Sequence, residues 1–260
     1  MYQTITFTIS DSICTIALNR PDVFNSFNEE MSAEFIDALK KADKDEAVRV
    51  VIITGTGKAF CSGQDLKDIQ NQTGNRSLSD SVVRRYNPMI LAIREMPKPI
   101  ICKLNGVAAG AGASLALACD LIIAAESSSL IEVFINVGLV PDSGSSFFLP
   151  RLVGYNKAFE LITLGTKITA REALDFGFVY KVVSSEELDS ATQELALRYA
   201  TGPTKTYGLV KKMLNKAYTS DLNNMLQYEA YNQGIAGSSE DYQEGVAAFI
   251  AKRKPQFKGQ

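Results

Sequence analysis

Residues 105–120 contain the feature that most constrains the fold, a turn of small residues between an apolar strand and a helix. The apolar run 99–102 before the turn predicts a strand, and the run 115–118 after it favours a helix. Gly106, Gly110 and Gly112 lack side chains, so another molecule can approach the backbone closely. Because the first N–H groups of a helix have no partner within it, this turn predicts a site that works through main-chain donors.

The composition excludes several kinds of partner. The chain has 260 residues, enough for one large or two small domains, and its 27 basic and 29 acidic residues give a net charge of −2. This balance does not favour nucleic acid or an anionic membrane as the main partner. No run of about 18 apolar residues and no secretory-type N-terminal segment occurs. We therefore expect a soluble, cytoplasmic protein without a membrane partner.

Histidine is absent from the sequence. This excludes a Ser-His-Asp or Cys-His mechanism, a histidine metal site and imidazole as a general base. Acid–base chemistry near neutral pH must then use a carboxylate, Tyr, Lys or Cys. The four cysteines, Cys14, Cys61, Cys102 and Cys119, have no metal-ligand spacing and are expected to be buried thiols. No metal site is predicted.

The first half of the chain alternates strands with helices. Residues 4–9 and 13–18 alternate polar and apolar side chains around a short turn, which predicts a hairpin. Asn28 then fits the N-cap of an amphipathic helix. The continuous apolar run 48–54 is typical of a strand in a sheet that is covered on both faces.

Further along, residues 59–66 form a second small-residue turn leading into a helix, and residues 70–80 read as a polar loop. A helix is expected over 81–95 and further strands over 120–125 and 178–183. Helices dominate from about residue 156 onward. This order predicts an α/β core over residues 1–200 and a helical region over 201–260.

Six short segments, in order along nearly the whole chain, carry a family resemblance. They are residues 19–21, 59–66, 98–101, 105–120, 138–141 and 249–257. Together they resemble the enoyl-CoA hydratase/isomerase (crotonase) superfamily. The resemblance implies an α/β spiral of ββα units with a helical C-terminal trimerisation region. It also implies an acyl-CoA substrate, a homotrimer or hexamer, and no cofactor beyond the coenzyme A of the thioester.

The resemblance also assigns site residues. It places the two backbone N–H donors of an oxyanion hole at Gln64 and Ala111, both in small-residue turns that precede helices, where free donors are expected. Asp65 also fits the N-cap of the following helix. Lys252 either meets CoA phosphates, including across a subunit interface, or is part of a solvated charged end. The implied substrate- or CoA-binding positions are Ala59, Cys61, Gly63, Asp65, Gly110 and Lys252.

The two glutamates with which hydratases of this superfamily hold water are missing. Ser114 and Phe134 stand at their positions, and neither side chain can act as a carboxylate. Glu132 lies nearby but would require a shift of two residues. Two-glutamate hydration is therefore not expected.

Asp142 is the predicted catalytic residue. Several isomerases of the superfamily carry an acidic residue at this position. The surrounding segment 137–154 resembles phenylacetate-pathway epoxyphenylacetyl-CoA isomerases, except that Ser145 replaces a usual glycine. An isomerase needs one base to remove a proton and return it elsewhere, and apolar surroundings would raise the basicity of Asp142.

Other interpretations stay open at this point. Asp142 also fits a helix N-cap, since its turn is rich in Pro, Ser and Gly. Hydration with Asp142 or Glu132 holding water is the second hypothesis, and a non-catalytic acyl-CoA-binding protein is the third. RNA binding is disfavoured by the net charge of −2 and by the lack of an aromatic-basic motif.

Overall fold

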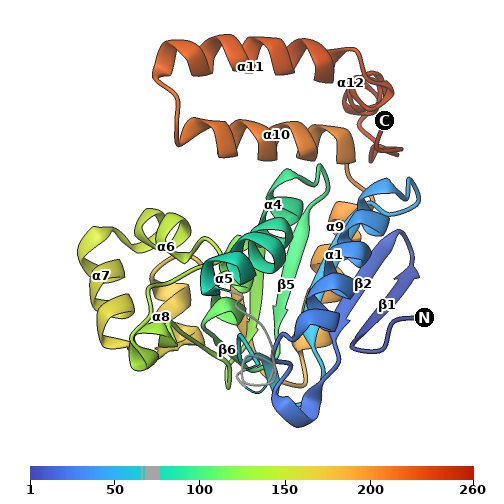
Figure 1. Ribbon diagram of the computed structural model, residues 1–260. Coiled ribbons are helices and arrows are strands. Elements are labelled where there is room, and N and C mark those ends of the chain that lie inside the picture. The colour runs from blue at the N-terminus through green and yellow to red at the C-terminus, as the bar shows by residue number, and fades with distance from the viewer. Residues whose placement is uncertain (66, 68–76) are drawn as a thin grey trace.

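The strands form two sheets, which lie in the lower part of the molecule as drawn in Figure 1. The computed structural model describes residues 1–65, 67 and 77–260. The larger sheet contains, in spatial order, β1 (Ile5–Ser10), β2 (Ile13–Leu18), β3 (Val50–Gly55), β5 (Ile100–Leu104), β7 (Leu121–Ala125) and β10 (Lys181–Val183). The smaller sheet contains β4 (Ala59–Cys61), β6 (Val107–Ala109), β8 (Ser129–Ile131) and β9 (Ile168–Thr169).

The helices lie between and around these strands. In the core they are α1 (Glu29–Lys44), α3 (Leu78–Ser81), a π-helical turn (Val82–Tyr86), α4 (Asn87–Glu95), α5 (Ala111–Ala118), α6 (Ser145–Val153), α7 (Tyr155–Leu164), α8 (Ala170–Asp175) and α9 (Leu188–Ala200). Two 3₁₀ turns cover Pro21–Val23 and Val133–Val137. The C-terminal helices are α10 (Thr204–Ala217), α11 (Leu222–Gly237) and α12 (Glu240–Ile250).

The winding of the chain confirms the predicted spiral. Each of β3, β5 and β7 lies in the large sheet and is followed at once by a short strand, β4, β6 or β8, in the small sheet. β4, β6 and β8 pair in parallel, so the turns that follow them come together at one edge of the small sheet. A repeated ββα arrangement of this kind therefore gathers the segments after β4, β6 and β8.

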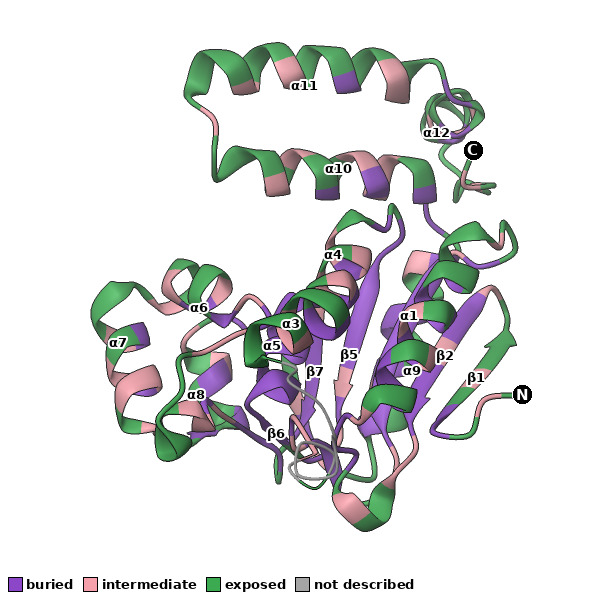
Figure 2. Ribbon diagram, viewed as in Figure 1, coloured by how far each residue is buried: buried purple, intermediate pink, exposed green. Residues whose placement is uncertain are grey.

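The large sheet is covered on both faces, as the run 48–54 predicted. Val51 and Ile53 of β3 pack into a core that includes Phe35 of α1. Val50 and Ile52 pack on the opposite face into a second core, whose helical side chains come from α9. In Figure 2 the neighbouring strand β5 of the same sheet is likewise drawn as mostly buried.

Most predicted element positions are confirmed. The hairpin pairs Ile5 with Leu18, and Asn28 Oδ1 accepts a hydrogen bond from Met31 N over 2.9 Å at the start of α1. The expected loop 70–80 is wrong at its end, because Ser77 Oγ accepts from Asp80 N and begins a helix there. Residues 70–76 lie outside the described part of the chain. The strand expected over 178–183 is shorter and starts at Lys181.

The C-terminal helices form a layer beyond one end of the large sheet (Figure 1). Arg49, just before β3, holds this layer: its guanidinium donates to the carbonyl of Gly202, to Phe257 O over 3.1 Å and to Thr204 Oγ1 over 2.9 Å. None of the helices in the described residues is long and apolar enough to span a membrane.

Replacing Arg49 with alanine is expected to lower the free energy of unfolding by about 1.5–3 kcal/mol, because two part-buried carbonyl acceptors lose a charged donor. Urea unfolding measures this difference. The control is Arg171→Ala, since Arg171 is exposed on α8. Equal stability of the two variants would show that the contacts of Arg49 do not hold the C-terminal layer.

Candidate active site

Two small-residue turns meet at the edge of the small sheet. Gly63 follows β4 with φ +90°, and Gly110 follows β6 with φ +52°, a backbone region that glycine adopts most readily. A Cβ atom on Gly63 would lie 2.8 Å from Ala109 O and 3.4 Å from Ala111 N. The two turns are therefore in contact, and their closeness requires glycine at position 63.

The two turns present free backbone donors. Ala111 is the first residue of α5, and Gln64 follows Gly63. Neither amide N–H has a hydrogen-bond acceptor within the described chain. The Gln64 side chain is fixed from two sides, because Tyr86 Oη donates to its Oε1 and its Nε2 donates to Phe27 O over 3.4 Å. These contacts hold Gln64 in place, and both Gln64 and Ala111 line one cavity.

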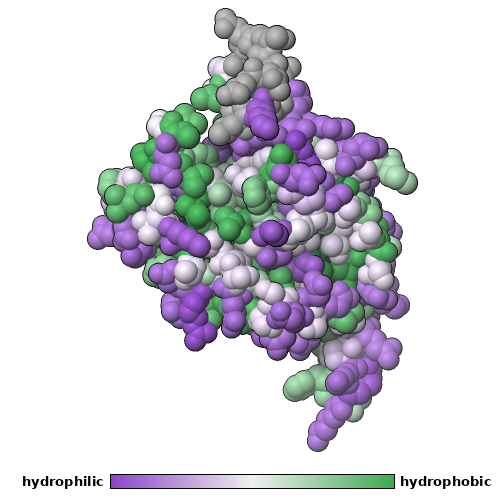
Figure 3. Space-filling model, turned by 90° about the horizontal axis from the view of Figure 1, so that it is seen from below, coloured by the Kyte–Doolittle hydropathy of each residue, from purple (hydrophilic) through white to green (hydrophobic). Residues whose placement is uncertain are grey.

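That cavity has a volume of about 710 Å³ and a mainly apolar wall. Most residues of the segment 137–144 line the cavity, and several apolar side chains of this segment are exposed, including Val137 and Val140. Figure 3 shows hydrophobic side chains gathered on the left of the molecule seen from below, the side of α6 and α7 in Figure 1. The residues that line the cavity, among those described, are Ser62, Gly63, Gln64, Ser77, Leu78, Ser79, Ser81, Val82, Val83, Tyr86, Asn87, Gly110, Ala111, Val133, Phe134, Asn136, Val137, Leu139, Val140, Pro141, Asp142, Ser143 and Gly144.

Asp142 brings a carboxylate to this wall. Burial raises the pKa of Asp142, although Ser143 Oγ, which donates to Asp142 Oδ1 over 2.8 Å, acts in the opposite direction. Helix α6 begins at Ser145 with Gly144 as its N-cap, and no side chain caps it. The capping alternative for Asp142 is therefore not observed. Its carboxylate is available for chemistry in the cavity.

The two hydratase positions are filled without carboxylates. Ser114 is completely buried in α5. Phe134 packs its ring at the Gly110 turn, where a Cβ on the glycine would lie 3.7 Å from Phe134 Cζ. Neither residue can activate water as a base. The Phe134 ring therefore occupies a position at which, by the family resemblance, hydratases carry a carboxylate.

Glu132 is the second carboxyl near the site, but it does not line the cavity. It is 2% exposed and accepts a hydrogen bond at Oε1 from Ser145 Oγ over 2.7 Å. Burial, helped by the charge of Asp142, raises the pKa of Glu132 to about 7. The hypothesis that Glu132 holds the water of a hydratase is not supported by this placement.

Glu132→Gln should make the protein more stable at alkaline pH. The ordinary pKa of the glutamate is 4.5, so with rising pH the unfolded chain loses this proton first, and the free energy of unfolding falls until about pH 7. The variant does not lose this stability. Its free energy of unfolding should therefore exceed that of the wild type by on the order of 3 kcal/mol above pH 7 and by almost nothing near pH 4. Urea unfolding across this range tests it, with exposed Glu126→Gln expected to follow wild type. A constant difference at all pH values would contradict the assignment.

The other predicted binding residues lie in different places. Gly63 and Gly110 line the cavity, whereas Ala59 and Cys61 do not. Ala59 and Cys61 are buried in β4, and burial raises the pKa of the Cys61 thiol to about 12. Their side chains belong to the core, so any contact with a ligand would involve the backbone.

Asp65 forms structural contacts. Its Oδ1 accepts from Lys67 N over 3.0 Å, and its Oδ2 forms an ion pair with Arg20 over 2.9 Å. Most of the helix that Asp65 was expected to cap lies outside the described residues. Lys252 follows α12 in the C-terminal layer and does not line the cavity. A contact of Lys252 with a ligand in the cavity would need a second subunit.

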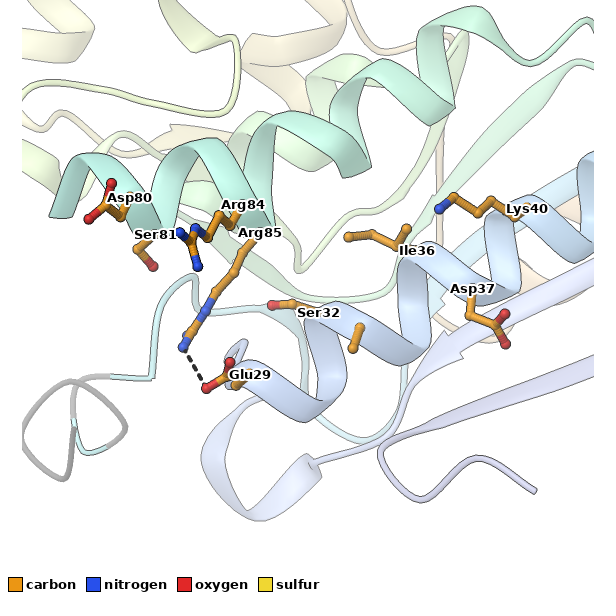
Figure 4. A pocket seen from close by; sticks show the side chains of 10 residues that line it. Glu29, Ser32, Ile36, Asp37, Lys40, Asp80, Ser81, Arg84 and Arg85 are labelled. Carbon is orange, nitrogen blue, oxygen red and sulfur yellow. Dashed lines mark hydrogen bonds and ion pairs between the residues drawn. The ribbon is translucent and has the colours of Figure 1, made fainter. Parts of the chain in front are cut away.

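A second, charged hollow of about 370 Å³ lies between α1 and the helical segment 78–86 (Figure 4). Arg84 and Arg85 reach into it, and Arg85 Nη2 forms an ion pair with Glu29 Oε2 over 3.2 Å. It contains none of the predicted site residues. The cavity with Asp142 and the two free amides is therefore the candidate active site.

Known proteins share this architecture over their whole length. Residues 8–260 match the family model described as enoyl-CoA hydratase/isomerase. The chain is 44% identical to the 1,2-epoxyphenylacetyl-CoA isomerase of Escherichia coli over 261 residues, covering 100% of both. It is 32% identical to the trans-2-decenoyl-[acyl-carrier-protein] isomerase of Streptococcus mutans over 260 residues, covering 99% of both. The crystal structure of an enoyl-CoA hydratase from Bacillus anthracis superposes with a TM-score of 0.92 at 34% identity, covering 99% of this chain and 100% of that one. The chain therefore belongs to the enoyl-CoA hydratase/isomerase family of enzymes.

Proposed function

We propose that this enzyme is an acyl-CoA isomerase in which Asp142 moves a proton and the N–H groups of Gln64 and Ala111 hold the thioester oxygen. The observation that carries the proposal is that one cavity is lined by a carboxylate that caps no helix and by two amides without acceptors. This combination provides a base and an oxyanion hole. It provides no second carboxylate on the cavity wall, among the described residues, to activate water.

The reaction follows from these groups. Asp142 takes a proton from a carbon next to the thioester carbonyl or conjugated to it, and the C–H electron pair moves to the carbonyl oxygen to form an enolate. The two N–H groups stabilise that negative charge. Asp142 then returns the proton to a different carbon. Substrate and product have the same atoms, so neither water nor a cofactor beyond the CoA of the thioester is consumed.

The names of two relatives and the apolar wall of the cavity indicate the substrate class that we propose. The relative at 44% identity is named for 1,2-epoxyphenylacetyl-CoA, and a second relative for a decenoyl thioester. A mainly apolar cavity of about 710 Å³ suits the acyl part of either. We propose ring-epoxide phenylacetyl-CoA or unsaturated acyl-CoA. For the epoxide, proton transfer by Asp142 would accompany expansion of the six-membered ring to an oxepin, in which the C–C bond shared with the epoxide breaks and both C–O bonds are kept.

Incubating the enzyme with 1,2-epoxyphenylacetyl-CoA, a 3-enoyl-CoA and crotonyl-CoA tests the proposal. The expected products are isomers with unchanged mass and altered absorbance. Conversion of crotonyl-CoA into a product that has gained water would instead favour the hydratase. Binding without turnover of any thioester would favour the non-catalytic acyl-CoA-binding protein.

We also propose that the enzyme works in the cytoplasm as a homotrimer or hexamer. Large apolar side chains are exposed on the C-terminal helices, including Leu222 and Tyr231 of α11 and Phe249 and Ile250 of α12. Burying them against another subunit would remove this apolar surface from water. Sedimentation equilibrium distinguishes a trimer from a hexamer.

A further inference from the structure

A chain of hydroxyl groups connects Glu132 to the backbone of the candidate site. Ser145 Oγ lies 2.7 Å from Glu132 Oε1 and 2.7 Å from Ser114 Oγ. Ser114 Oγ in turn lies 3.1 Å from Asp142 O and 3.2 Å from Gly110 O. The side chains of Glu132, Ser145 and Ser114 are all buried. We call these three residues the polar chain.

The Ser114 end of the polar chain meets two groups that matter for the proposed reaction. The carbonyl of Gly110 belongs to the same peptide unit as the N–H of Ala111, the proposed oxyanion donor. The carbonyl of Asp142 belongs to the residue that carries the proposed base. A change in hydrogen bonding at Ser114 therefore acts directly on the backbone of both groups.

The direction of the polar chain depends on one proton. Each serine hydroxyl has a single hydrogen, so an ionised Glu132 accepts from Ser145, and Ser145 accepts from Ser114. A neutral Glu132 with its proton on Oε1 donates to Ser145, which leaves Ser114 free to donate to the carbonyl of Gly110 or Asp142.

The environment of Glu132 selects where that proton sits. Glu132 Oε2 is buried and has no hydrogen-bond partner in the described part of the chain. A proton on Oε2 would have no acceptor there, whereas a proton on Oε1 has the Ser145 hydroxyl. Ionisation would leave Oε2 charged without a donor, which is costly in a buried position. Of the titratable groups described, Asp142 is the one whose charge acts on Glu132.

We propose that Glu132 is a proton-dependent positioning residue, which acts through Ser145 and Ser114 on the Gly110–Ala111 peptide and on Asp142. This inference rests on the proposed function of the same site. In the neutral form of Glu132, Ser114 donates to the peptide carbonyl and polarises the Ala111 N–H into a stronger donor. When Glu132 loses its proton to solvent, the donor and acceptor roles along the polar chain reverse. The Ala111 N–H then becomes a weaker donor.

The pH dependence of kcat tests the inference. The wild type should lose activity, roughly fivefold, as pH rises through about 7. Glu132→Gln should abolish this alkaline fall, because the hydrogen bonding of an amide does not change with pH. Ser145→Ala should abolish it too by interrupting the polar chain, and the double variant should add nothing further. Ser128→Ala, which removes another buried serine hydroxyl, should keep the fall.

A spectroscopic measurement separates this inference from the proposed function. The probe is phenylacetyl-CoA with ¹³C at the thioester carbonyl, which binds without isomerising. Its infrared carbonyl stretch should rise in frequency through about pH 7 in the wild type and stay constant in Glu132→Gln. If this shift occurs without isomerase activity on any substrate, the proposed function fails and the positioning role stands.

Three results would overturn the inference. One is an isomerase whose alkaline fall in kcat is the same in wild type, Glu132→Gln and Ser145→Ala. Another is an equal loss of activity at every pH in both variants, which would indicate a purely structural role. The third is a bound probe whose carbonyl stretch changes with pH in the same way in the wild type and in Glu132→Gln.

Discussion

Replacing Asp142 with asparagine is expected to lower kcat for thioester isomerisation by about 10²–10⁴-fold, the usual contribution of a positioned acid–base group. Asparagine keeps the shape of the side chain and can still accept from Ser143 Oγ, so the fold and the cavity should persist. It cannot take up the proton that the reaction moves. The KM for acyl-CoA should change little, because the two backbone donors remain in place.

The matched control is Asp175→Asn, since Asp175 is exposed at the end of α8. Its kcat should equal that of the wild type. Circular dichroism and urea unfolding establish that both variants are folded. Isomerisation by Asp142→Asn at nearly the wild-type rate would remove Asp142 from the mechanism. The proton would then have to move through another group on the cavity wall.

The pH profile gives an independent check on Asp142. The base must be ionised, so activity should rise with pH through the pKa of Asp142, which burial moves above its ordinary value of 3.8. The acid limb of the kcat profile should therefore lie at a higher pH than it would for an exposed aspartate.

Local patterns in the sequence were sufficient for most of the fold. The run 48–54 predicts a strand covered on both faces because residues 50–53 are all apolar, and β3 is buried along its full length. Asn28 predicts a helix start because its side chain satisfies an otherwise free N–H. The spiral arrangement of the ββα units came only from the family resemblance, because it depends on long-range pairing.

The role of Asp142 could not be decided from sequence. A Pro-Asp-Ser-Gly segment is good turn chemistry and also a good N-cap. The structure shows only that Asp142 does not cap α6, because Ser143 and Gly144 both have positive φ, 53° and 86°, and α6 starts after them. These two backbone conformations depend on the packing of α6 and not on the four residues alone.

The polar chain was missed for a similar reason. Ser145 in place of a usual glycine, Ser114 in place of a glutamate and the nearby Glu132 were each visible as separate departures from the family pattern. Their contact depends on how α5 packs against α6, which brings together residues 31 positions apart. Reading the three departures together would have been the only signal available in the sequence.

Replacing Gly63 with alanine is expected to lower kcat by about 10²–10³-fold, the loss that follows removal of one oxyanion-hole donor. The added Cβ would meet Ala109 O at 2.8 Å and Ala111 N at 3.4 Å. Backbone atoms cannot rotate away as a side chain can, so the two turns must separate. The N–H groups of Gln64 and Ala111 would then no longer converge on one oxygen.

The control for this variant is Gly154→Ala. Gly154 has φ +78°, close to the +90° of Gly63, but a Cβ there would have no atom within 4 Å. Both variants place an alanine at a positive φ, a conformation that L side chains rarely adopt, and only Gly63→Ala disturbs the donors. Measured where both variants are fully folded, kcat should fall in Gly63→Ala alone. Equal activities would mean that the approach of the two turns does not control the reaction, and the thioester oxygen would need another pair of donors.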